Sequence, residues 1–568
     1  MKKYLLTAAL LACVSASAQD LTSIQTTSSE DLNGTARFVG MGGAMSALGA
    51  DMSTMSTNPA GMGLFRKSDV SFTFSGQWQP SSERRAMNDR DKFVTSFDQA
   101  GFVFALPMGN SGKLRGINLG FNYHKSRNFQ EFVCTNDIAT GGLSQSMQLE
   151  DLTKTNIGGF GVIDLENDAE GSSWGRSWAL PISNLAYDCY YLDAYDNVDL
   201  QGTYMDPNTG RERYYSVSPA SSYNYNRVQW GDTRAYDFNI SFNIKDRAYL
   251  GFDVGYYTAS INSVTQYNEV TRGMSPTPGA GVNVTGPYAM VNDQYTSGSG
   301  VDFKFGLIVR PIEDNPFRFG LAIHTPRFMS MTSNSVLSMR NGNVVDGSGN
   351  IGQTVSGAVT IDPFRYRIRT PWKLNFSLAT TLSNWLALDA EYEMNNYSSA
   401  AIQYEKDSYY RPGYGYLTDA EKDVYWDNEV KANLKTQHTF RLGVEGRFAT
   451  NFYGRFGYNY VTSCYKDNAR LVLSPYAGDD QGFSYNDGKY SESYYQQTST
   501  DLVRFGDINR VTFGLGYHGK NFYVDAAYML QTQKAAVRPF DLGADIHVPE
   551  ANVTLHRNQI LLTLGAKF

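Results

Sequence analysis

Few residues in this sequence have the types and spacing that catalysis or metal binding would require. Gly514-Leu-Gly-Tyr-His-Gly-Lys520 has the spacing of a phosphate-binding P-loop, but Asn521 stands where serine or threonine is needed, and the segment leads into a turn. No G-x-S-x-G nucleophile motif occurs. The 6 histidines show no paired ligand spacing. We therefore expect no enzyme, no metal site and no cofactor.

The cysteines give no metal or redox motif either. Cys13 falls in a leader that we expect to be removed, and Cys134, Cys189 and Cys464 lack C-x-x-C spacing. An odd number of widely separated cysteines does not predict a disulfide framework. One disulfide among the three stays open at this point.

Small and turn-forming residues are concentrated before residue 68. The run from Ala36 to Asp51 would let a short helix lie close against another surface, and the run from Asn58 to Gly61 favours a fixed tight turn. The residues that we expect to matter in these runs are Gly40, Gly42, Gly43, Asn58, Pro59, Ala60 and Gly61. They need a scaffold against which to pack.

Residues 1–18 have the pattern of a secretory signal peptide. Lys2 and Lys3 precede an apolar stretch, and Ala16-Ser17-Ala18 forms a cleavage site; Cys13 as a lipoprotein acylation site is the alternative. Removing the two lysines leaves 47 basic against 56 acidic residues, a formal charge of −9, which disfavours nucleic acid as a partner. The rest of the chain has no run of roughly 18 to 20 apolar residues that would form a membrane helix.

Alternating apolar and polar residues instead predict strands. At the end of the chain Ile560, Leu562 and Leu564 share one face with Ala566 and Phe568. The same pattern recurs along the chain, and we count fourteen strands joined alternately by six short turns and seven longer loops. A high content of aromatic residues and glycine, with 39 Tyr, 32 Phe and 53 Gly, suits strands that face lipid on one side.

This pattern favours an all-β fold, a 14-stranded antiparallel transmembrane β-barrel with a small N-terminal plug in its lumen. An even strand count closes such a barrel, and short periplasmic turns alternate with long external loops. A soluble β-sandwich is the alternative, because its strands alternate in the same way. We assign 1–18 to the signal peptide, 19–68 to the plug, and 69–568 to the barrel, whose largest external loop is about 129–232.

The N-terminal motif, Ala36 to Asp51 followed by Thr57-Asn-Pro-Ala-Gly-Met62, resembles that of FadL-type outer-membrane transporters of long-chain fatty acids and other hydrophobic compounds. Weaker echoes lie at 324–328, 370–373 and 440–445. The resemblance implies a monomer in the outer membrane of a Gram-negative bacterium, surrounded by lipid. It also implies passive transport by external capture, binding next to a plug that gates the lumen, and sideways exit. Residues 58–61 could belong to a movable plug or form a turn fixed to the barrel wall, and the sequence does not choose between these two alternatives.

The sideways exit requires a strand that fails to pair, and Gly116 and Gly120 are our candidates for that kink. The alternative is that these glycines only relieve crowding against the plug. For capture of a fatty acid-like ligand, the candidates in the largest loop are Trp174, Trp178, Leu180 and Ile182. A self-packed loop domain would use the same residues.

A second function stays open. Relatives of the FadL-type family include barrels that bind protein cargo within an outer-membrane secretion system, and long external loops would serve that role. An apolar pocket beside Asn58 to Gly61 would favour transport over this scaffold function.

Overall fold

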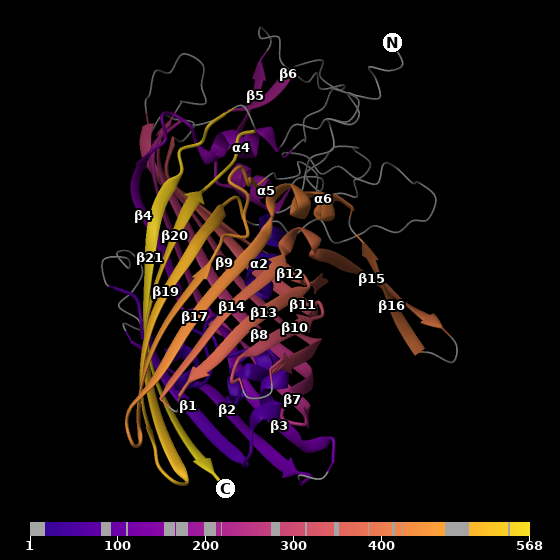
Figure 1. The fold of residues 1–568 in the computed structure, drawn as a ribbon. Coiled ribbons are helices and arrows are strands. Elements are labelled where there is room, and N and C mark those ends of the chain that lie inside the picture. The colour runs from indigo at the N-terminus through magenta and orange to yellow at the C-terminus, as the bar shows by residue number, and fades with distance from the viewer. Residues whose placement is uncertain are drawn as a thin grey trace, which may run out of the picture.

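The computed structural model describes residues 18–568, except 81–92, 110–111, 153–164, 166–179, 198–211, 217–218, 274–283, 313–314, 346–350, 384, 412–414, 423, 472–498 and 544–545. The expected signal peptide 1–18 therefore lies almost wholly outside the described residues. The described chain forms a tall barrel whose first strand lies beside its last (Figure 1).

The described strands close into a 14-stranded antiparallel barrel, as the sequence predicts. Each strand pairs with its neighbour in chain order, and β1 pairs with β21 from Asp69↔Lys567 to Trp78↔Asn558. The barrel strands are β1 (Asp69–Trp78), β2 (Val94–Pro107), β3 (Leu114–Asn128), β7 (Ala220–Ile244), β8 (Ala248–Gly273), β9 (Val284–Val309), β10 (Arg318–His324), β13 (Lys373–Leu382), β14 (Leu386–Asn396), β17 (Thr436–Ala449), β18 (Phe452–Val461), β19 (Leu502–His518), β20 (Phe522–Arg538) and β21 (Ala551–Lys567).

The short turns all lie at the end of the barrel where β1 begins, and the longer connections lie at the other end (Figure 1). We call these the periplasmic end and the outer end, following the rule that long loops are external. The outer end carries further strands: β4 (Glu131–Ala139), β5 (Asp193–Asn197), β6 (Glu212–Ser216), β11 (Phe328–Val345), β12 (Ile351–Arg369), β15 (Ala401–Arg411) and β16 (Gly415–Lys422). It also carries α4 (Gln145–Asp151), α5 (Pro181–Asp188), η6 (Tyr397–Ser399) and α6 (Val424–Asn433).

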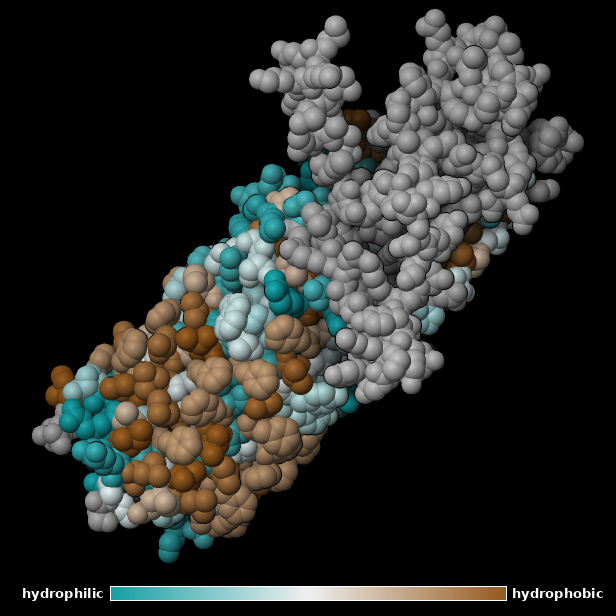
Figure 2. All heavy atoms as spheres, turned by 90° about the vertical axis from the view of Figure 1, so that its right-hand side faces the viewer, coloured by the Kyte–Doolittle hydropathy of each residue, from teal (hydrophilic) through white to brown (hydrophobic). Residues whose placement is uncertain are grey.

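Apolar side chains face outward over the periplasmic half of the barrel. On β9, for example, Val301, Phe303 and Phe305 are 39%, 44% and 46% exposed, while Asp302 and Lys304 between them are buried. Figure 2 shows hydrophobic side chains, in brown, gathered over the periplasmic half on the face in view. An exposed apolar band of this kind, over a polar interior, is the pattern of a transmembrane β-barrel. None of the helices in the described ranges is long and apolar enough to cross a membrane.

Several strands are longer than the sequence predicts. Beyond the apolar band their apolar side chains lie on the inner face instead of the outer face, so the pattern used to find the strands ends there. On β8 we expected a strand ending near Tyr256, but it continues to Gly273, with Tyr257 and Tyr267 buried on the inner face. The predicted external loop 129–232 likewise includes β4 and the first half of β7. These inner-face residues join α4, α5 and α6 in one apolar cluster, which we call the outer core.

Candidate functional site

The N-terminal segment, residues 21–65, lies inside the barrel (Figure 1). Its elements are α2 (Ala18–Ser28), α3 (Ala36–Gly40), η1 (Met52–Ser56) and η2 (Pro59–Leu64). Capping residues begin three of these elements, α3, η1 and η2. The side chains of Thr35, Asp51 and Asn58 each accept a hydrogen bond from a backbone N–H in the first turn that follows. Pro59 at the first position of η2 suits a helix start, because that N–H would have no partner.

Glycines let this segment approach the barrel wall closely. Gly42 has φ +66°, and a Cβ there would lie 2.9 Å from the backbone nitrogen of Tyr458. Gly43 has φ +80°, a conformation that glycine adopts without strain. Gly40 lies against Gly514 of β19, so the run that resembles a P-loop is part of a wall strand. These contacts agree with the close packing that the small residues predict.

The run from Asn58 to Gly61 packs against β7, β8 and β9. The Asn58 side chain accepts from Ala60 N (3.1 Å) and donates to the Leu307 carbonyl (3.4 Å), and Asn239 Nδ2 donates to the Pro59 carbonyl (3.3 Å). The glycines of β8 and β9 that face this run leave no room for a side chain. The run is a wall contact in this structure.

Carboxylates of β14 hold the middle of the N-terminal segment. Glu391 accepts the backbone N–H groups of Met45 and Ser46, both at 2.6 Å. Asp389 accepts those of Ala47 and Leu48 at 3.2 and 2.8 Å. A carboxylate that accepts two N–H groups anchors the backbone more strongly than a neutral acceptor does.

A buried ion pair adds a third anchor. Arg37 of α3 makes a two-fold contact with Glu445 of β17, at 2.9 and 2.8 Å. Arg455 of β18 shares Glu445 and also contacts Asp525 at 2.6 Å. Glu445, Arg455 and Asp525 lie on the polar strand faces that the sequence assigns to a hydrated lumen.

Among the described strands, the barrel wall is interrupted toward its outer end. The β2–β3 ladder stops at His124, and the β1–β21 ladder stops at Trp78. Above these points β4 and β21 approach within 8 Å at Cα, and no strand of the described chain pairs with both. The side chain of Gln79 accepts the Phe132 backbone N–H of β4 at 2.9 Å, in place of a strand. We call this region the slot.

Asp31 of the N-terminal segment joins the two sides of the slot from within. Its carboxylate accepts the backbone N–H of Asn128 at the end of β3 (2.9 Å) and pairs with Arg557 of β21 (2.9 Å). Its own N–H donates to the Ser126 carbonyl at 2.8 Å. We did not single out Asp31 from the sequence. The signal was available, because Glu30 and Asp31 form an acidic pair in an otherwise uncharged stretch.

Glu30 performs a similar role on the opposite wall. It pairs with Arg327, at the bend between β10 and β11, and with Lys373 at 2.7 Å. The bend on β10–β11 and a matching one at Thr370 lie in two of the three weaker sequence echoes, 324–328 and 370–373, and the Arg327 backbone N–H donates to Thr370 Oγ1 at 2.8 Å. These echoes mark the points where the strands pass from the barrel into its outer extension.

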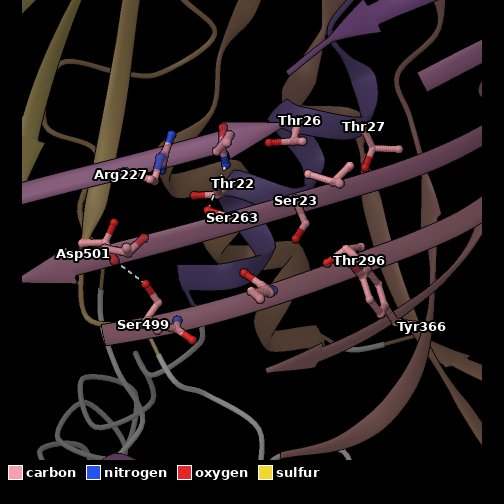
Figure 3. Close-up of a pocket in the computed structure, with 15 residues that line it drawn as sticks. Thr22, Ser23, Thr26, Thr27, Arg227, Ser263, Thr296, Tyr366, Ser499 and Asp501 are labelled. Carbon is pink, nitrogen blue, oxygen red and sulfur yellow. Dashed lines mark hydrogen bonds between the residues drawn. The ribbon is translucent and has the colours of Figure 1, made fainter. Parts of the chain in front are cut away.

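Three cavities that adjoin the N-terminal segment are lined by both polar and apolar surface. One, of about 60 Å³, lies between α2 and strands β7 to β9 (Figure 3). Most of its lining residues carry a hydroxyl or amide group: Thr22, Ser23, Thr26, Thr27, Arg227, Gln229, Ile261, Ser263, Thr265, Asn292, Gln294, Thr296, Tyr366, Ser499 and Asp501. A second and a third, of about 50 and 60 Å³, contain Glu30 and Asp31 among their linings. Asn58 to Gly61 line none of the three.

Gly116 and Gly120, our candidates for a kink, both pair with β2 and β7. Gly116 is the last pair of the β2 ladder and borders a register shift in the β7 ladder, whereas Gly120 is paired regularly with both strands. A Cβ at Gly120 would lie 2.4 Å from Met55 Cε, so this glycine makes room for the N-terminal segment, as the alternative predicts. The interruption lies further along the same strand, at its outer end. Sequence reasoning missed this position because no glycine marks it.

The capture candidates divide into two pairs. Leu180 and Ile182 are each 1% exposed and belong to the outer core, as the self-packed alternative predicts. Trp174 and Trp178 lie outside the described residues. Leu180 and Ile182 are therefore not accessible to a ligand that arrives from solvent.

The rest of the described chain adds no competing chemistry. Within the described ranges, no group of three or more His, Cys, Asp or Glu side chains could hold a metal ion. Cys134, Cys189 and Cys464 form no disulfide with one another in this structure.

No protein-family model matches the sequence, and no curated protein matches it significantly. Solved structures that are similar include the toluene transporter TbuX of Ralstonia pickettii (13% identity, TM-score 0.45, 94% of this chain and 99% of that one). A FadL homologue of Pseudomonas aeruginosa gives 12% identity and TM-score 0.45 over 95% and 99%. The toluene transporter TodX of P. putida gives 10% and 0.41 over 95% and 99%. The resemblance of this chain to FadL-type outer-membrane transporters rests on its N-terminal motif.

Proposed function

We propose that this protein is a passive outer-membrane transporter of hydrophobic small molecules such as long-chain fatty acids. The N-terminal segment acts as a plug, because a fourteen-stranded barrel is close in width to barrels that hold open aqueous channels. The observation that carries the proposal is the slot, where the plug residue Asp31 joins two wall strands that do not pair. A single residue there couples the plug to a gap in the wall.

A sideways exit suits a hydrophobic cargo. Burial of apolar surface stabilises a ligand by about 25 cal/mol per Å², so an apolar molecule enters lipid without an energy source. The charged inner face of the strands, with side chains such as Asp389 and Glu391, makes a path straight through the lumen unfavourable for it. The slot lies just above the apolar band, since Ile560 of β21 faces outward below it while His556 and Thr554 face outward beside it. A cargo leaving there enters the outer leaflet.

The substitution Asp31→Asn tests this proposal. It removes the charge that pairs with Arg557, and a hydrogen bond to a charged group contributes about 1.5–3 kcal/mol. If opening of the slot limits transport, initial uptake of a radiolabelled fatty acid by cells expressing the variant rises by roughly ten-fold. Asp246→Asn is the matched control, because Asp246 pairs with Arg66 at the periplasmic end at 2.6 Å. We expect it to leave uptake unchanged.

Two results would contradict the proposal at different points. Uptake equal to that of cells without the protein would reject transport itself. Protein-dependent uptake that Asp31→Asn leaves unchanged would keep transport and reject the slot as its limiting step.

The long connections at the outer end favour the second function, a binding or scaffold barrel of a secretion system. An apolar pocket beside Asn58 to Gly61 would favour transport instead. Mass spectrometry after gentle purification separates the two functions. A bound hydrophobic small molecule inside the barrel supports transport, and a stoichiometric protein partner without such a ligand supports the scaffold.

A further inference from the structure

Three arginines form a row on the outward face of β12. Arg365 and Arg369 are exposed and Arg367 is half-buried, while Tyr366 and Ile368 between them are 2% and 1% exposed and belong to the outer core. Because alternate residues of a strand face opposite sides, the three arginine side chains point away from the barrel. A cationic row is unexpected on a chain with a formal charge of −7.

The row begins where the apolar band ends. Arg369 pairs with Phe328 of β11, which is 52% exposed, and Trp372 below it is 53% exposed. On the neighbouring strands β9 and β8, the band ends at Val301 and Tyr256. The arginines therefore stand directly above the hydrocarbon region on this side of the barrel.

The length of the row matches the headgroup layer. A strand rises about 3.3 Å per residue, so at a tilt of about 40° the four residues from Arg369 to Arg365 rise roughly 10 Å. The polar layer on each side of a bilayer is roughly 5–7 Å thick. A guanidinium at every second residue thus places positive charge across the whole outer headgroup layer.

We propose that Arg365 and Arg369, with Arg367 adding positive charge between them, bind the phosphate groups of a phosphorylated glycolipid in the outer leaflet. Guanidinium groups match phosphate oxygens two at a time. The same lipid would lay its acyl chains against Phe328 and Trp372. Free phosphate lacks this second contact, and exposed ion pairs alone contribute only about 0–1 kcal/mol. The site therefore selects the lipid over the free anion.

A second basic pair at the same level provides a control. Lys125 of β3 and Arg234 of β7 lie opposite each other just above the exposed aromatic band, next to Tyr123 and Tyr236. Asp232 lies between them, 3.1 Å from Lys125 Nζ and 2.7 Å from Arg234 Nε. This pair already has its own carboxylate, so we expect it to bind phosphate weakly.

The test compares the variant R365Q/R369Q with K125Q/R234Q in the full-length protein. Binding of a bis-phosphorylated lipid A to each protein in mixed micelles is titrated, with dephosphorylated lipid A and inorganic phosphate as separate probes. Each arginine near an anionic surface contributes about 1 kcal/mol, which is about five-fold in affinity. We expect R365Q/R369Q to weaken binding of the phosphorylated lipid by roughly 25-fold, and K125Q/R234Q to change it less than five-fold.

Three outcomes would overturn the proposal. They are equal affinity of the wild type for the dephosphorylated lipid, affinity for inorganic phosphate that matches that for the lipid, and unchanged binding by R365Q/R369Q. Retention of the folded form on unboiled gels establishes that each variant still forms the barrel. Substitution of Arg365 and Arg369 by lysine, which keeps the charge, is expected to restore most of the binding.

Discussion

The periplasmic and outer halves of this barrel are built from the same strands, but their apolar side chains lie on opposite faces of those strands. In the periplasmic half of β8, Phe252 and Val254 point outward and are each 43% exposed. In the outer half, Tyr257 and Tyr267 point inward and are each 2% exposed. The change of side occurs where lipid gives way to water. Whether the apolar side chains point outward or inward therefore indicates whether lipid or water surrounds that stretch of strand.

This reversal explains why the two interiors are filled differently. The periplasmic half has a polar interior, so it is filled by a segment that hydrogen-bonds to carboxylates such as Asp389 and Glu391. The outer half has an apolar interior, so it is filled by its own loops and helices in the outer core. One half is held mainly by directional polar contacts and the other mainly by apolar burial.

The largest expected effect is in the outer core. Leu337 of β11 is fully buried there, and Leu337→Ala should destabilise the outer half by about 2–5 kcal/mol. Hydrogen exchange of peptides covering 328–345 measures this loss, while the apolar band keeps its protection. Val336→Ala, on the outward face of the same strand, is the matched control and should cost less than about 1 kcal/mol. Equal losses for the two variants would contradict the inward and outward faces assigned to β11.

The next effect concerns the outward face of β9. Phe303→Arg places a charge in the apolar band and should destabilise the barrel by about 2–4 kcal/mol. Ser297→Arg places the same charge on the same face above the band, where we expect a change near zero. Urea titration of folding into lipid vesicles measures both. Similar costs at the two positions would show that the band extends above Val301.

The membrane-embedded strands were predictable because lipid imposes one simple pattern. Runs such as 301–309 and 452–460 alternate without interruption, and the structure places both in the wall. The outer halves of β8 and β9 were not predictable, because tyrosine, serine and threonine on alternating faces give no clear contrast between core and surface. The apolar face also changes from outward to inward within a single strand. A search for one continuous apolar face therefore misses the outer half of that strand.

The candidate site was predictable only in part. Gly42 and Asn58 could be singled out, because a close approach and a tight turn need particular residue types. Asp31 could not be assigned a role, because its partners Asn128 and Arg557 lie far away in sequence. The kink at Gly116 and Gly120 stays a prediction, because glycine occurs at sites of close packing, such as Gly120 against Met55, as well as at breaks in a strand.

The smallest expected effect is a pH dependence confined to α6 in the outer half. Burial raises the pKa of the Glu429 carboxyl to about 7, and the hydrogen bond from Asn433 (2.8 Å) only partly opposes this. The folded state therefore holds the proton more tightly than the unfolded chain, whose carboxyl has a pKa near 4.5. The contribution of this group is complete below about pH 4.5, falls as the pH rises toward 7, and is absent above that.

We expect hydrogen-exchange protection of 428–434, corrected for intrinsic rates, to decrease between pH 5 and pH 8. Glu429→Gln should remove this dependence, because its neutral amide occupies the same site at every pH. Asp467→Asn is the control, since Asp467 is exposed on the neighbouring segment, and it should leave the dependence intact. A dependence that persists in Glu429→Gln would assign the titration to another group of the outer half. Glu429 lies next to Val430 of the outer core, and its pKa is raised by burial. The pH dependence of protection therefore measures how far water is excluded from this part of the outer core.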